Sequence, residues 1–330
     1  MREKPKKPRY SRYIQVKCSE IILLAIPGKG SIMETEACGC RDIPIKRGSS
    51  KQSNRRYEIM ERPAFTHEKL TEHIYRITDS VDVCCYLIVG RDRACLCDTC
   101  WGIGNIREYV ETITALPVFV LLTHGHLDHV GGAGFFEEVC MDTADAPVFL
   151  EHSDARFRAE HVRMHLGLDP AALCLAPSFS GTLTHVPAGT VYDLGGVHIE
   201  ALPLKGHTPG SLSPRIPEDG AVIVGDGCDD TVLLFEEYSL SVSEYRRNLL
   251  EYREKIRDCA LLLGNHESFV LVPEVIDNVI ECCDAAMAGT DAHVPLEYGG
   301  HAVFSCCALR GMVRADGRRG NLFYSADKIK

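Results

Sequence analysis

Residues 123–129 read Thr-His-Gly-His-Leu-Asp-His and gather three imidazoles and one carboxylate in a single short segment. His124, His126 and Asp128 alternate along the chain, whereas His129 follows Asp128 directly and faces another side. A loop with this spacing can present nitrogen ligands to one metal ion and an oxygen and a nitrogen to a second. Neutral imidazole and carboxylate suit Zn²⁺, and they also suit iron and manganese. The segment therefore predicts a metal centre at the end of a strand.

Three later positions offer further side chains of the same kind. His207 lies in the run Gly-His-Thr-Pro-Gly-Ser, Asp226 follows Val-Gly, and His266 follows Gly-Asn. Each of them comes shortly after an apolar stretch that predicts a strand. In this order the four motifs resemble those of the metallo-β-lactamase-fold hydrolases, and the resemblance covers roughly residues 65–290. The fold that it implies belongs to the α/β class and is a four-layer αββα sandwich.

Carried onto this chain, the family pattern implies two metal sites that share one carboxylate. The ligands would be His124, His126 and His207 for the first metal, Asp128, His129 and His266 for the second, and Asp226 as the bridge. The resemblance implies two divalent ions, Zn²⁺ before iron or manganese, and a hydroxide between them as the nucleophile. Asp128 would also receive a proton for the leaving group. The expected protein is therefore an enzyme, a dinuclear metallohydrolase that needs no nucleophilic serine or cysteine.

The substrate is less well defined than the chemistry. The complete histidine motif and the bridging Asp226 point to the hydroxyacylglutathione hydrolase-like and lactonase-like branches, and hence to an ester, thioester or lactone of a small molecule. Residues 227–230 lack the aromatic and basic residues that would recognise glutathione, and Asp229 stands where lactonases commonly have a tyrosine. A phosphodiesterase or a β-lactam hydrolase on the same metal centre is the alternative. An oxygen- or NO-reducing di-iron protein would normally replace His126 by a carboxylate and add a flavin domain, and a non-catalytic scaffold would be expected to have lost ligands.

Other residues are weaker candidates for the site. Similar proteins place substrate-contacting groups in their C-terminal strands, where this chain has His301 and Lys328. Phe235 and Tyr238 follow Asp226 closely and could form a wall of the pocket or simply belong to the core. Three further histidines lie on one expected helix, where a surface or lid helix is favoured over a third metal site: His152, His161 and His165.

The composition is that of an ordinary globular protein, with 330 residues, 45% of them hydrophobic and 25% charged. The net charge of −10 conceals an asymmetry, because residues 1–57 carry 14 Lys and Arg against 5 Asp and Glu. Residues 58–330 carry 22 Lys and Arg against 41 Asp and Glu, and such an acidic domain would repel the phosphates of a nucleic acid. The apolar run at residues 21–26 is too short for a membrane span or an export signal. We therefore expect a small-molecule substrate, no nucleic-acid or membrane partner, and a cytoplasmic location, while the oligomeric state stays open.

Sixteen cysteines would suit a disulfide scaffold, but their positions do not. Three adjacent doublets occur, and neighbours in a strand point to opposite faces, so they could not all pair. Most are expected to be free, small, buried hydrophobic residues in a reducing cytosol. The spacing of Cys95, Cys97 and Cys100 raises the alternative of a zinc site, but no second Cys-x-x-Cys pair completes it.

The elements that must position these residues follow from the periodicity. Strands are expected at 74–78, 83–89, 94–98, 117–122, 148–150, 191–194, 197–202, 221–224 and 260–263, with two or three more in the last thirty residues. Helices are expected at 105–116, 152–166, 243–257 and 273–287. The chain is thus divided into a basic, flexible leader (1–57) and a hydrolase domain (58–330), the latter with a lid insertion at about 151–190 and C-terminal strands at 293–330.

Overall fold

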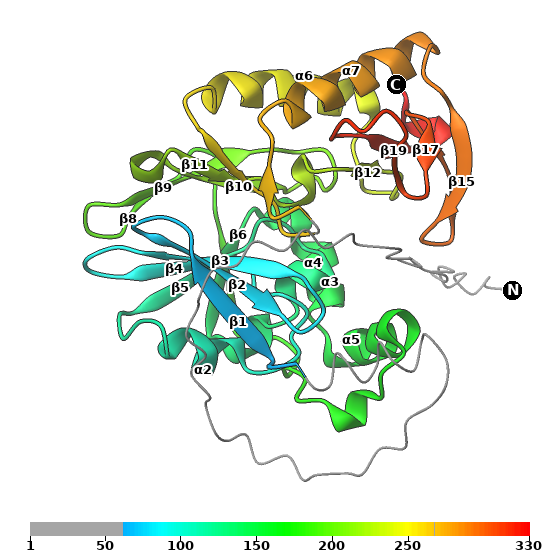
Figure 1. Cartoon of the computed structure of the whole chain (residues 1–330). Coiled ribbons are helices and arrows are strands. Elements are labelled where there is room, and N and C mark those ends of the chain that lie inside the picture. The colour runs from blue at the N-terminus through cyan, green and yellow to red at the C-terminus, as the bar shows by residue number, and fades with distance from the viewer. Residues whose placement is uncertain (1–61, 267) are drawn as a thin grey trace, which may run out of the picture.

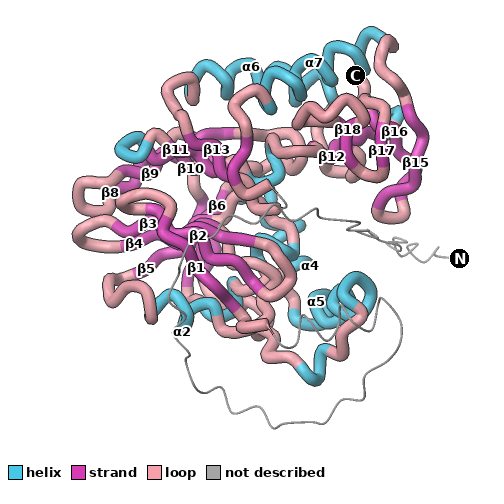
Figure 2. The backbone as a smooth tube through the Cα atoms, in the orientation of Figure 1, coloured by secondary structure: helices cyan, strands magenta, loops and turns pink. Residues whose placement is uncertain are grey.

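A computed structural model describes residues 62–266 and 268–330, so the predicted leader at 1–57 lies outside the described residues. Two large sheets face each other at the centre of the molecule, and a smaller third sheet lies at one end (Figure 1). Helices cover the outer sides of the two large sheets (Figure 2). No helix in these residues is long and apolar enough to cross a membrane.

The first sheet has seven strands in the order of the chain. They are β1 (Phe65–Lys69), β2 (Ile74–Asp79), β3 (Cys84–Val89), β4 (Ala94–Cys97), β5 (Val118–Leu121), β6 (Glu138–Met141) and β7 (Thr182–His185). Strands β1 to β4 are antiparallel neighbours, whereas β4 to β7 are parallel to one another. The carboxyl ends of β4 and β5 therefore lie side by side, because Cys97 is paired with Leu121.

The second sheet has six strands in the order β14-β13-β11-β10-β9-β8. They are β8 (Val191–Asp193), β9 (His198–Pro203), β10 (Leu212–Ile216), β11 (Ala221–Ile223), β13 (Leu261–Leu263) and β14 (Val270–Leu271). Strand β11 is parallel to β13, and it is also parallel to β9 because both are antiparallel to β10. Three carboxyl ends, those of β9, β11 and β13, thus meet at one edge of this sheet.

A buried core fills the space between the two sheets. Ile88 and Cys97 from the first sheet pack there with Ile199 and Ile223 from the second. Outside the first sheet, α2 (Ile106–Glu111) contributes Ile106 to another core, and α4 (Ala146–His152) contributes Phe149. The order of layers on this side is therefore helix, sheet, sheet.

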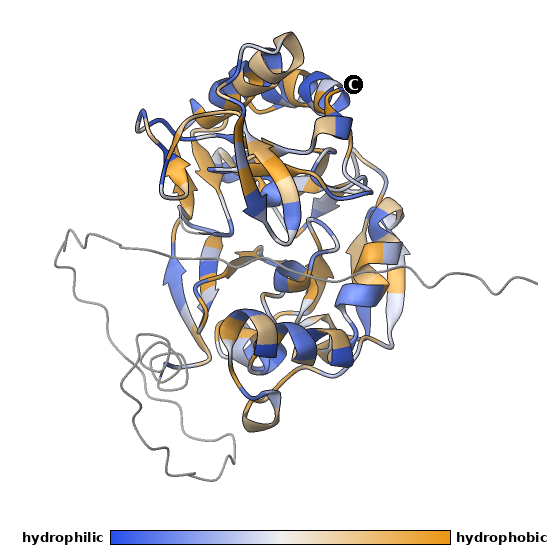
Figure 3. Ribbon diagram, turned by 90° about the vertical axis from the view of Figure 1, so that its right-hand side faces the viewer, coloured by the Kyte–Doolittle hydropathy of each residue, from blue (hydrophilic) through white to orange (hydrophobic). Residues whose placement is uncertain are grey.

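The second sheet is covered by two longer helices, α6 (Val242–Lys255) and α7 (Val275–Ala288). Tyr245 and Leu249 of α6 and Val279 of α7 pack on Val222 of β11. This layer completes the four-layer αββα sandwich, so the predicted fold class is confirmed. Figure 3 shows hydrophobic residues along the central strands, while the helices carry hydrophilic and hydrophobic residues side by side.

The C-terminal part forms the third sheet, in the order β12-β19-β16-β15. Its strands are β12 (Val232–Leu234), β15 (Val294–Tyr298), β16 (His301–Ser305) and β19 (Leu322–Tyr324), and a separate hairpin joins β17 (Leu309–Arg310) to β18 (Val313–Arg314). Leu322 and Tyr324 pack with residues of α7, which attaches this sheet to the sandwich. The last thirty residues and those just before them thus hold more strands than the two or three expected.

Short helices complete the chain. They are α3 (Leu127–Val130), α5 (Ala155–His161), the π-helical turn η3 (Val162–Leu166), and the single turns η1 (Ala133–Phe135), η2 (Thr143–Asp145), η4 (Pro170–Ala172), η5 (Pro217–Asp219), η6 (Gly225–Gly227) and η7 (Ala326–Lys328). The helix expected at 152–166 is therefore divided between α5 and η3. In the expected lid at 151–190, β7 pairs with β6 and belongs to the first sheet.

One expected strand is wrong. Residues 148–150 lie inside the helix α4, which begins just before Pro147, a residue suited to a first helical turn. Three consecutive apolar residues do not distinguish a buried strand from a buried helix, and here Phe149 is buried while Leu150 is exposed. Six short strands were not expected from the sequence: β1, β6, β7, β10, β12 and β14. Among them, β6 supplies the neighbour of β5.

Candidate metal centre

The seven predicted ligands all follow the carboxyl ends of strands. The histidine motif leaves β5 and enters α3, with His126 preceding the first residue of that helix. Asp226 and His266 each come three residues after a strand, β11 and β13, whose last residues Ile223 and Leu263 are paired. His207 follows β9 at the same edge of the second sheet. The topology therefore brings all these side chains to one place between the two sheets.

The backbone must make a tight turn at Gly225 to place Asp226. This glycine has a φ of +55°, in the left-handed region that side chains disfavour. A Cβ atom there would also lie 3.1 Å from the Oγ1 of Thr123. The glycine before the bridging aspartate is thus required both by its conformation and by its close approach to the histidine loop.

Four side chains form a first group of ligand atoms. They belong to His124, His126, His207 and Asp226, and one ligand atom of each lies within 4.8 Å of the others. The Nε2 atom of His207 is 2.9 Å from the Nδ1 atom of His126. The Oδ2 atom of Asp226 lies 3.8 Å from His124 Nε2 and 3.7 Å from His207 Nε2. Ligands about 2.0–2.1 Å from a tetrahedral Zn²⁺ have separations in this range.

A second group consists of Asp128, His129 and His266, and one ligand atom of each again lies within 4.8 Å of the others. The Nε2 atoms of His129 and His266 are 3.2 Å apart, and Asp128 Oδ2 is 3.5 Å from His266 Nε2. The Oδ1 atom of Asp226 lies 3.1 Å from His129 Nε2 and 3.2 Å from His266 Nε2. Asp226 thus turns one carboxylate oxygen toward each group.

The ring nitrogens that face away from the cluster are held by hydrogen bonds. His129 Nδ1 is 2.9 Å from the carboxylate of Asp98, and His126 Nε2 is 2.6 Å from the hydroxyl of Tyr238. His207 Nδ1 donates to the carbonyl oxygen of Leu233. The remaining contact joins His124 Nδ1 to Thr123 Oγ1. Such partners fix the orientation of each ring and leave the opposite nitrogen free for a metal.

Asp98 is a functional residue that the sequence analysis missed. It is fully buried directly after β4, and it accepts hydrogen bonds from the backbone and hydroxyl of Thr123 and from Asn265 Nδ2. A carboxylate immediately after a buried strand, next to the strand that carries the histidine motif, is the signal that could have revealed it. Tyr238 was considered as a pocket wall, and the structure places its hydroxyl on His126 instead.

The charges of the two groups differ. Burial lowers the pKa values of His124 and His126 well below the ordinary value, and neighbouring histidines add to this effect. Burial also opposes the charged form of His129 and His266, but the carboxylate of Asp226 raises the pKa of both rings. The pKa of His129 is well above its usual range, and that of His266 is about 9. Protons on the second group thus balance the carboxylates, and a cation would displace them.

The donor set fits a metal ion. His124 Nε2 and Asp226 Oδ1 are buried atoms without a hydrogen-bond partner, although both point into the cluster. Buried polar atoms are rarely left unpaired, because the cost is about 1–3 kcal/mol each. Imidazole nitrogens and carboxylate oxygens in this arrangement would be satisfied by two divalent cations.

The predicted substrate residues both contact the segment that follows β12. Lys328 Nζ donates to the carbonyl oxygens of Glu237 and Ser239, so it holds the loop that carries Tyr238. The ring of His301 packs against that of Phe235 with centroids 5.1 Å apart. Whether either residue contacts a substrate stays a prediction.

The three helical histidines do not form a third group of ligand atoms in the described residues. Their rings instead stack in sequence with that of Phe157, from His152 through Phe157 to His161 and His165. His152 also stacks on His126, with ring centroids 5.4 Å apart. Stacked rings thus connect α5 through His152 of α4 to His126, and the surface or lid helix favoured from the sequence stays a prediction.

The cysteine triplet does not form a zinc site either. The Sγ atoms of Cys95 and Cys97 are 3.8 Å apart in the core between the sheets, whereas Cys100 belongs to the core on the other side of the first sheet. All thirteen described cysteines are free, and eleven of them are buried. These residues therefore behave mainly as small hydrophobic side chains, as the sequence indicated.

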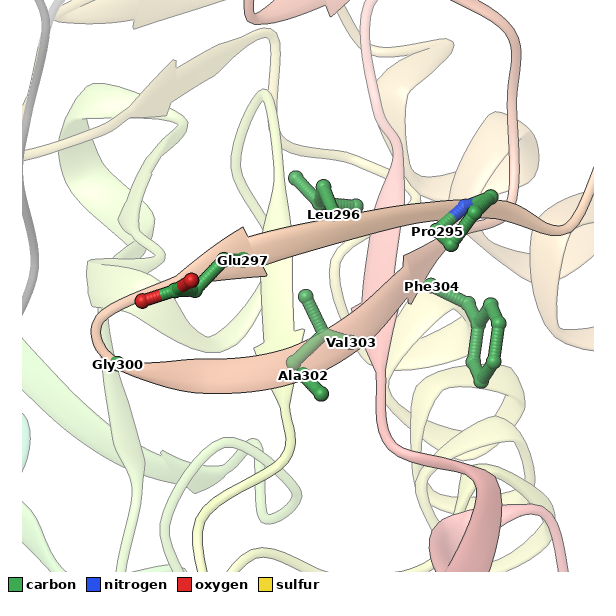
Figure 4. A pocket seen from close by; sticks show the side chains of 7 residues that line it. All are labelled: Pro295, Leu296, Glu297, Gly300, Ala302, Val303 and Phe304. Carbon is green, nitrogen blue, oxygen red and sulfur yellow. The ribbon is translucent and has the colours of Figure 1, made fainter.

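A pocket of about 560 Å³ lies along the hairpin of β15 and β16 (Figure 4). Its lining residues are Pro295, Leu296, Glu297, Gly300, Ala302, Val303 and Phe304. None of the predicted metal ligands or substrate residues is among them.

Comparison with known proteins defines the class. Residues 80–227 match the family model described as the metallo-beta-lactamase superfamily, a stretch that includes all predicted ligands except His266. The match agrees with the family that the motifs indicated, whereas the branch within it is not resolved. The fold agrees with a metallo-beta-lactamase from Pontibacter korlensis at a TM-score of 0.50, with 14% identity over 66% of this chain and 97% of that one. Comparison with a sec-alkylsulfatase from Pseudomonas sp. gives a TM-score of 0.52, with 14% identity over 68% of this chain and 42% of that chain.

Two curated relatives are more similar in sequence. A protein of Bacillus subtilis named "Probable metallo-hydrolase" is 28% identical over 148 residues, 43% of this chain and 64% of its own length. A protein of Gallus gallus named as an acyl-coenzyme A thioesterase is 25% identical over 176 residues, 48% of this chain and 62% of its own length. The chain thus spans less than two thirds of the length of each of these two relatives.

Proposed function

We propose that the protein is a dinuclear metal-dependent hydrolase that cleaves an ester, thioester or lactone bond in a small molecule. The observation that carries the proposal is the position of Asp226, whose two oxygens face two separate groups of ligand atoms. A carboxylate placed in this way can bridge two cations. The assigned ligands are those predicted from the sequence: His124, His126, His207, Asp128, His129, His266 and Asp226.

When bound, the two cations, Zn²⁺ before iron or manganese, would polarise the substrate carbonyl and lower the pKa of a water molecule. The protein's own contribution is to hold five rings and two carboxylates in fixed positions through partners such as Asp98 and Tyr238. The side chain of Asp128 is 27% exposed, so it can reach a substrate as well as a cation. We assign it the transfer of a proton to the leaving group.

The choice of an acyl substrate rests on two supports. The relative from Gallus gallus is named as an acyl-coenzyme A thioesterase, which makes a thioester the first substrate to test. The acidic balance of residues 58–330 disfavours long nucleic acids, although it does not disfavour a small phosphodiester. A phosphodiesterase or a β-lactam hydrolase is therefore the alternative on the same centre.

The test combines metal analysis with a substrate panel. Metal-stripped protein is reconstituted with Zn²⁺, Mn²⁺ or Fe²⁺, its metal content is measured, and rates are compared for thioesters, lactones, phosphodiesters and a β-lactam. We expect close to two ions in the histidine centre and fastest turnover of an acyl ester or thioester, abolished by a chelator. Failure to bind any of these metals would overturn the metal centre, whereas faster turnover of phosphodiesters or β-lactams would overturn the substrate class only.

A further inference from the structure

Three thiols gather far along the chain from the histidine centre. Cys282 lies on α7, and Cys306 and Cys307 follow the last residue of β16. The three Sγ atoms all lie within 4.8 Å of one another, and those of Cys282 and Cys307 are 3.5 Å apart. Cys282 and Cys306 are each 3% exposed, and Cys307 is partly exposed. The cluster is therefore closed on the side of α7 and open to solvent beside Cys307.

The backbone around the two adjacent cysteines is held by a buried polar network that does not use the thiols. The Oδ1 atom of Asn321 accepts a hydrogen bond from the backbone N–H of Cys307, and its Nδ2 donates to Ser305 Oγ. Ser305 Oγ in turn donates to the carbonyl oxygen of Cys307, and the N–H of Cys306 donates to the carbonyl of Leu322. Because these bonds fix the turn, the sulfur atoms are positioned before any ligand binds.

A cation stands beside the sulfur atoms. Arg314 Nη1 lies 4.0 Å from Cys282 Sγ and donates to the carbonyl oxygen of Gly320. Its other nitrogens are bound by the carboxylate of Asp316. This guanidinium favours the thiolate of Cys282, whereas the hydrogen bond to Cys307 and burial raise the pKa of that thiol. A divalent cation would therefore have to displace the thiol protons, because the thiolate is the form that binds metals.

From this geometry we infer that Cys282, Cys306 and Cys307 form a second metal site, selective for a thiophilic divalent cation such as Zn²⁺. At a Zn–S distance of about 2.3 Å, sulfur atoms in a tetrahedral site lie roughly 3.8 Å apart, close to the separation of Cys282 and Cys307. Three thiolates with Zn²⁺ leave one negative charge beside the Arg314–Asp316 pair, whereas Cu⁺ would leave two. Within the described residues no histidine or carboxylate joins the group, so solvent beside Cys307 takes the fourth position.

The site would join two segments of the chain. Cys282 belongs to a helix that covers the second sheet, whereas Cys306 and Cys307 belong to the third sheet, which lies beside α7 (Figure 1). A metal held by all three would fasten the C-terminal sheet to the sandwich. This role is independent of the hydrolytic centre and does not depend on the proposed function.

The test uses Co²⁺ as a spectroscopic probe on full-length, fully reduced, metal-stripped protein. Thiolate ligands give Co²⁺ an intense near-ultraviolet charge-transfer band, and neither ligand group of the histidine centre contains a cysteine. We expect this band in the wild-type protein, its loss in Cys307→Ala, and its displacement by Zn²⁺. The zinc content of Cys307→Ala should fall by about one ion per chain relative to the wild type.

Cys283→Ala is the matched control, because Cys283 is the fully buried neighbour of Cys282 on α7 and is not in the cluster. This variant should keep both the band and the zinc content. Absence of the band from reduced wild-type protein would overturn the inference without any variant, and so would a band unchanged in Cys307→Ala. A disulfide between Cys282 and Cys307, found by mass spectrometry in protein isolated without reductant and without metal at the cluster, would also overturn it.

Discussion

The Nδ1 atom of His129 and the Oδ2 atom of Asp98 lie 2.9 Å apart, and both side chains are completely buried. The carboxylate is the outer partner of a histidine whose Nε2 faces the second group of ligand atoms. It is also bonded by Thr123 at the start of the histidine motif and by Asn265 next to His266. One buried carboxylate thus orders both loops that supply the second group.

The first prediction concerns this carboxylate. Asp98→Asn keeps the size of the side chain but replaces one acceptor oxygen by a donor, and it removes the charge that supports His129. We expect the affinity for the second metal to fall by about 10–100-fold, with a smaller effect on the first. Competitive chelator titration measures both affinities. Asp193→Asn is the control, because the side chain of Asp193 is 65% exposed, and it should change neither metal affinity.

The second prediction concerns Tyr238, whose hydroxyl is 2.6 Å from His126 Nε2. Tyr238→Phe removes this hydrogen bond without opening a large cavity, so we expect roughly tenfold weaker binding of the first metal and an unchanged melting temperature of the metal-free protein. Tyr109→Phe loses a comparable contact to the exposed His67 and serves as the control. Equal metal affinities in the two variants would show that Tyr238 does not position the ring.

The third prediction concerns the bridge. Asp226→Ala should lose the second metal first and lower turnover by orders of magnitude, because two dications without a shared carboxylate repel each other at short range. His301→Ala should act mainly on the Michaelis constant, if it acts at all, since His301 packs on Phe235 and belongs to neither ligand group. Metal content and hydrolysis rate are measured for both variants. Full activity of Asp226→Ala with a single bound metal would indicate a mononuclear mechanism.

The fourth prediction is a dependence of stability on pH. Burial raises the pKa of Asp79 from 3.8 to about 7, against the hydrogen bonds that it accepts from the backbone of Val83, Val81 and Trp101. The folded state therefore holds a proton that the unfolded state releases above its lower pKa. The free energy of unfolding should thus fall between pH 4 and pH 7, by an amount on the order of a few kcal/mol.

Asp79→Asn provides the comparison, because an amide cannot ionise. Urea unfolding of the metal-free proteins across this pH range should show the stability of the wild type decreasing relative to the variant as pH rises. A constant difference between the two proteins would mean that Asp79 does not titrate in this range.

The site was largely predictable from the sequence because its ligands lie in short motifs at strand ends. His124 to His129 are close in the chain, and the order of His207, Asp226 and His266 identified the rest. Asp98 and Tyr238 were not predictable as partners of these rings, since they are separated from His129 and His126 by 31 and 112 residues. Such contacts depend on the packing of strands and loops, which no local pattern records.

The fold was predictable to the level of its layers and less so in its short elements. The Gly195-Gly196 hairpin and the helix that begins after Ser241 were expected, because turn glycines and a capping box act locally. The short strand β6 and the helix around Phe149 were not, because each has only a few apolar residues and tertiary packing decides their conformation.

The ligands of the histidine centre are divided between the two halves of the sandwich. His124 to His129 follow β5 of the first sheet, whereas His207, Asp226 and His266 follow β9, β11 and β13 of the second. A cation held here would join two halves that already meet through an apolar core and through hydrogen bonds such as that from Asn265 to Asp98. The spacing of the sheets at that edge would then set the ligand geometry, and core substitutions far from the centre that alter this spacing should tune its metal affinity.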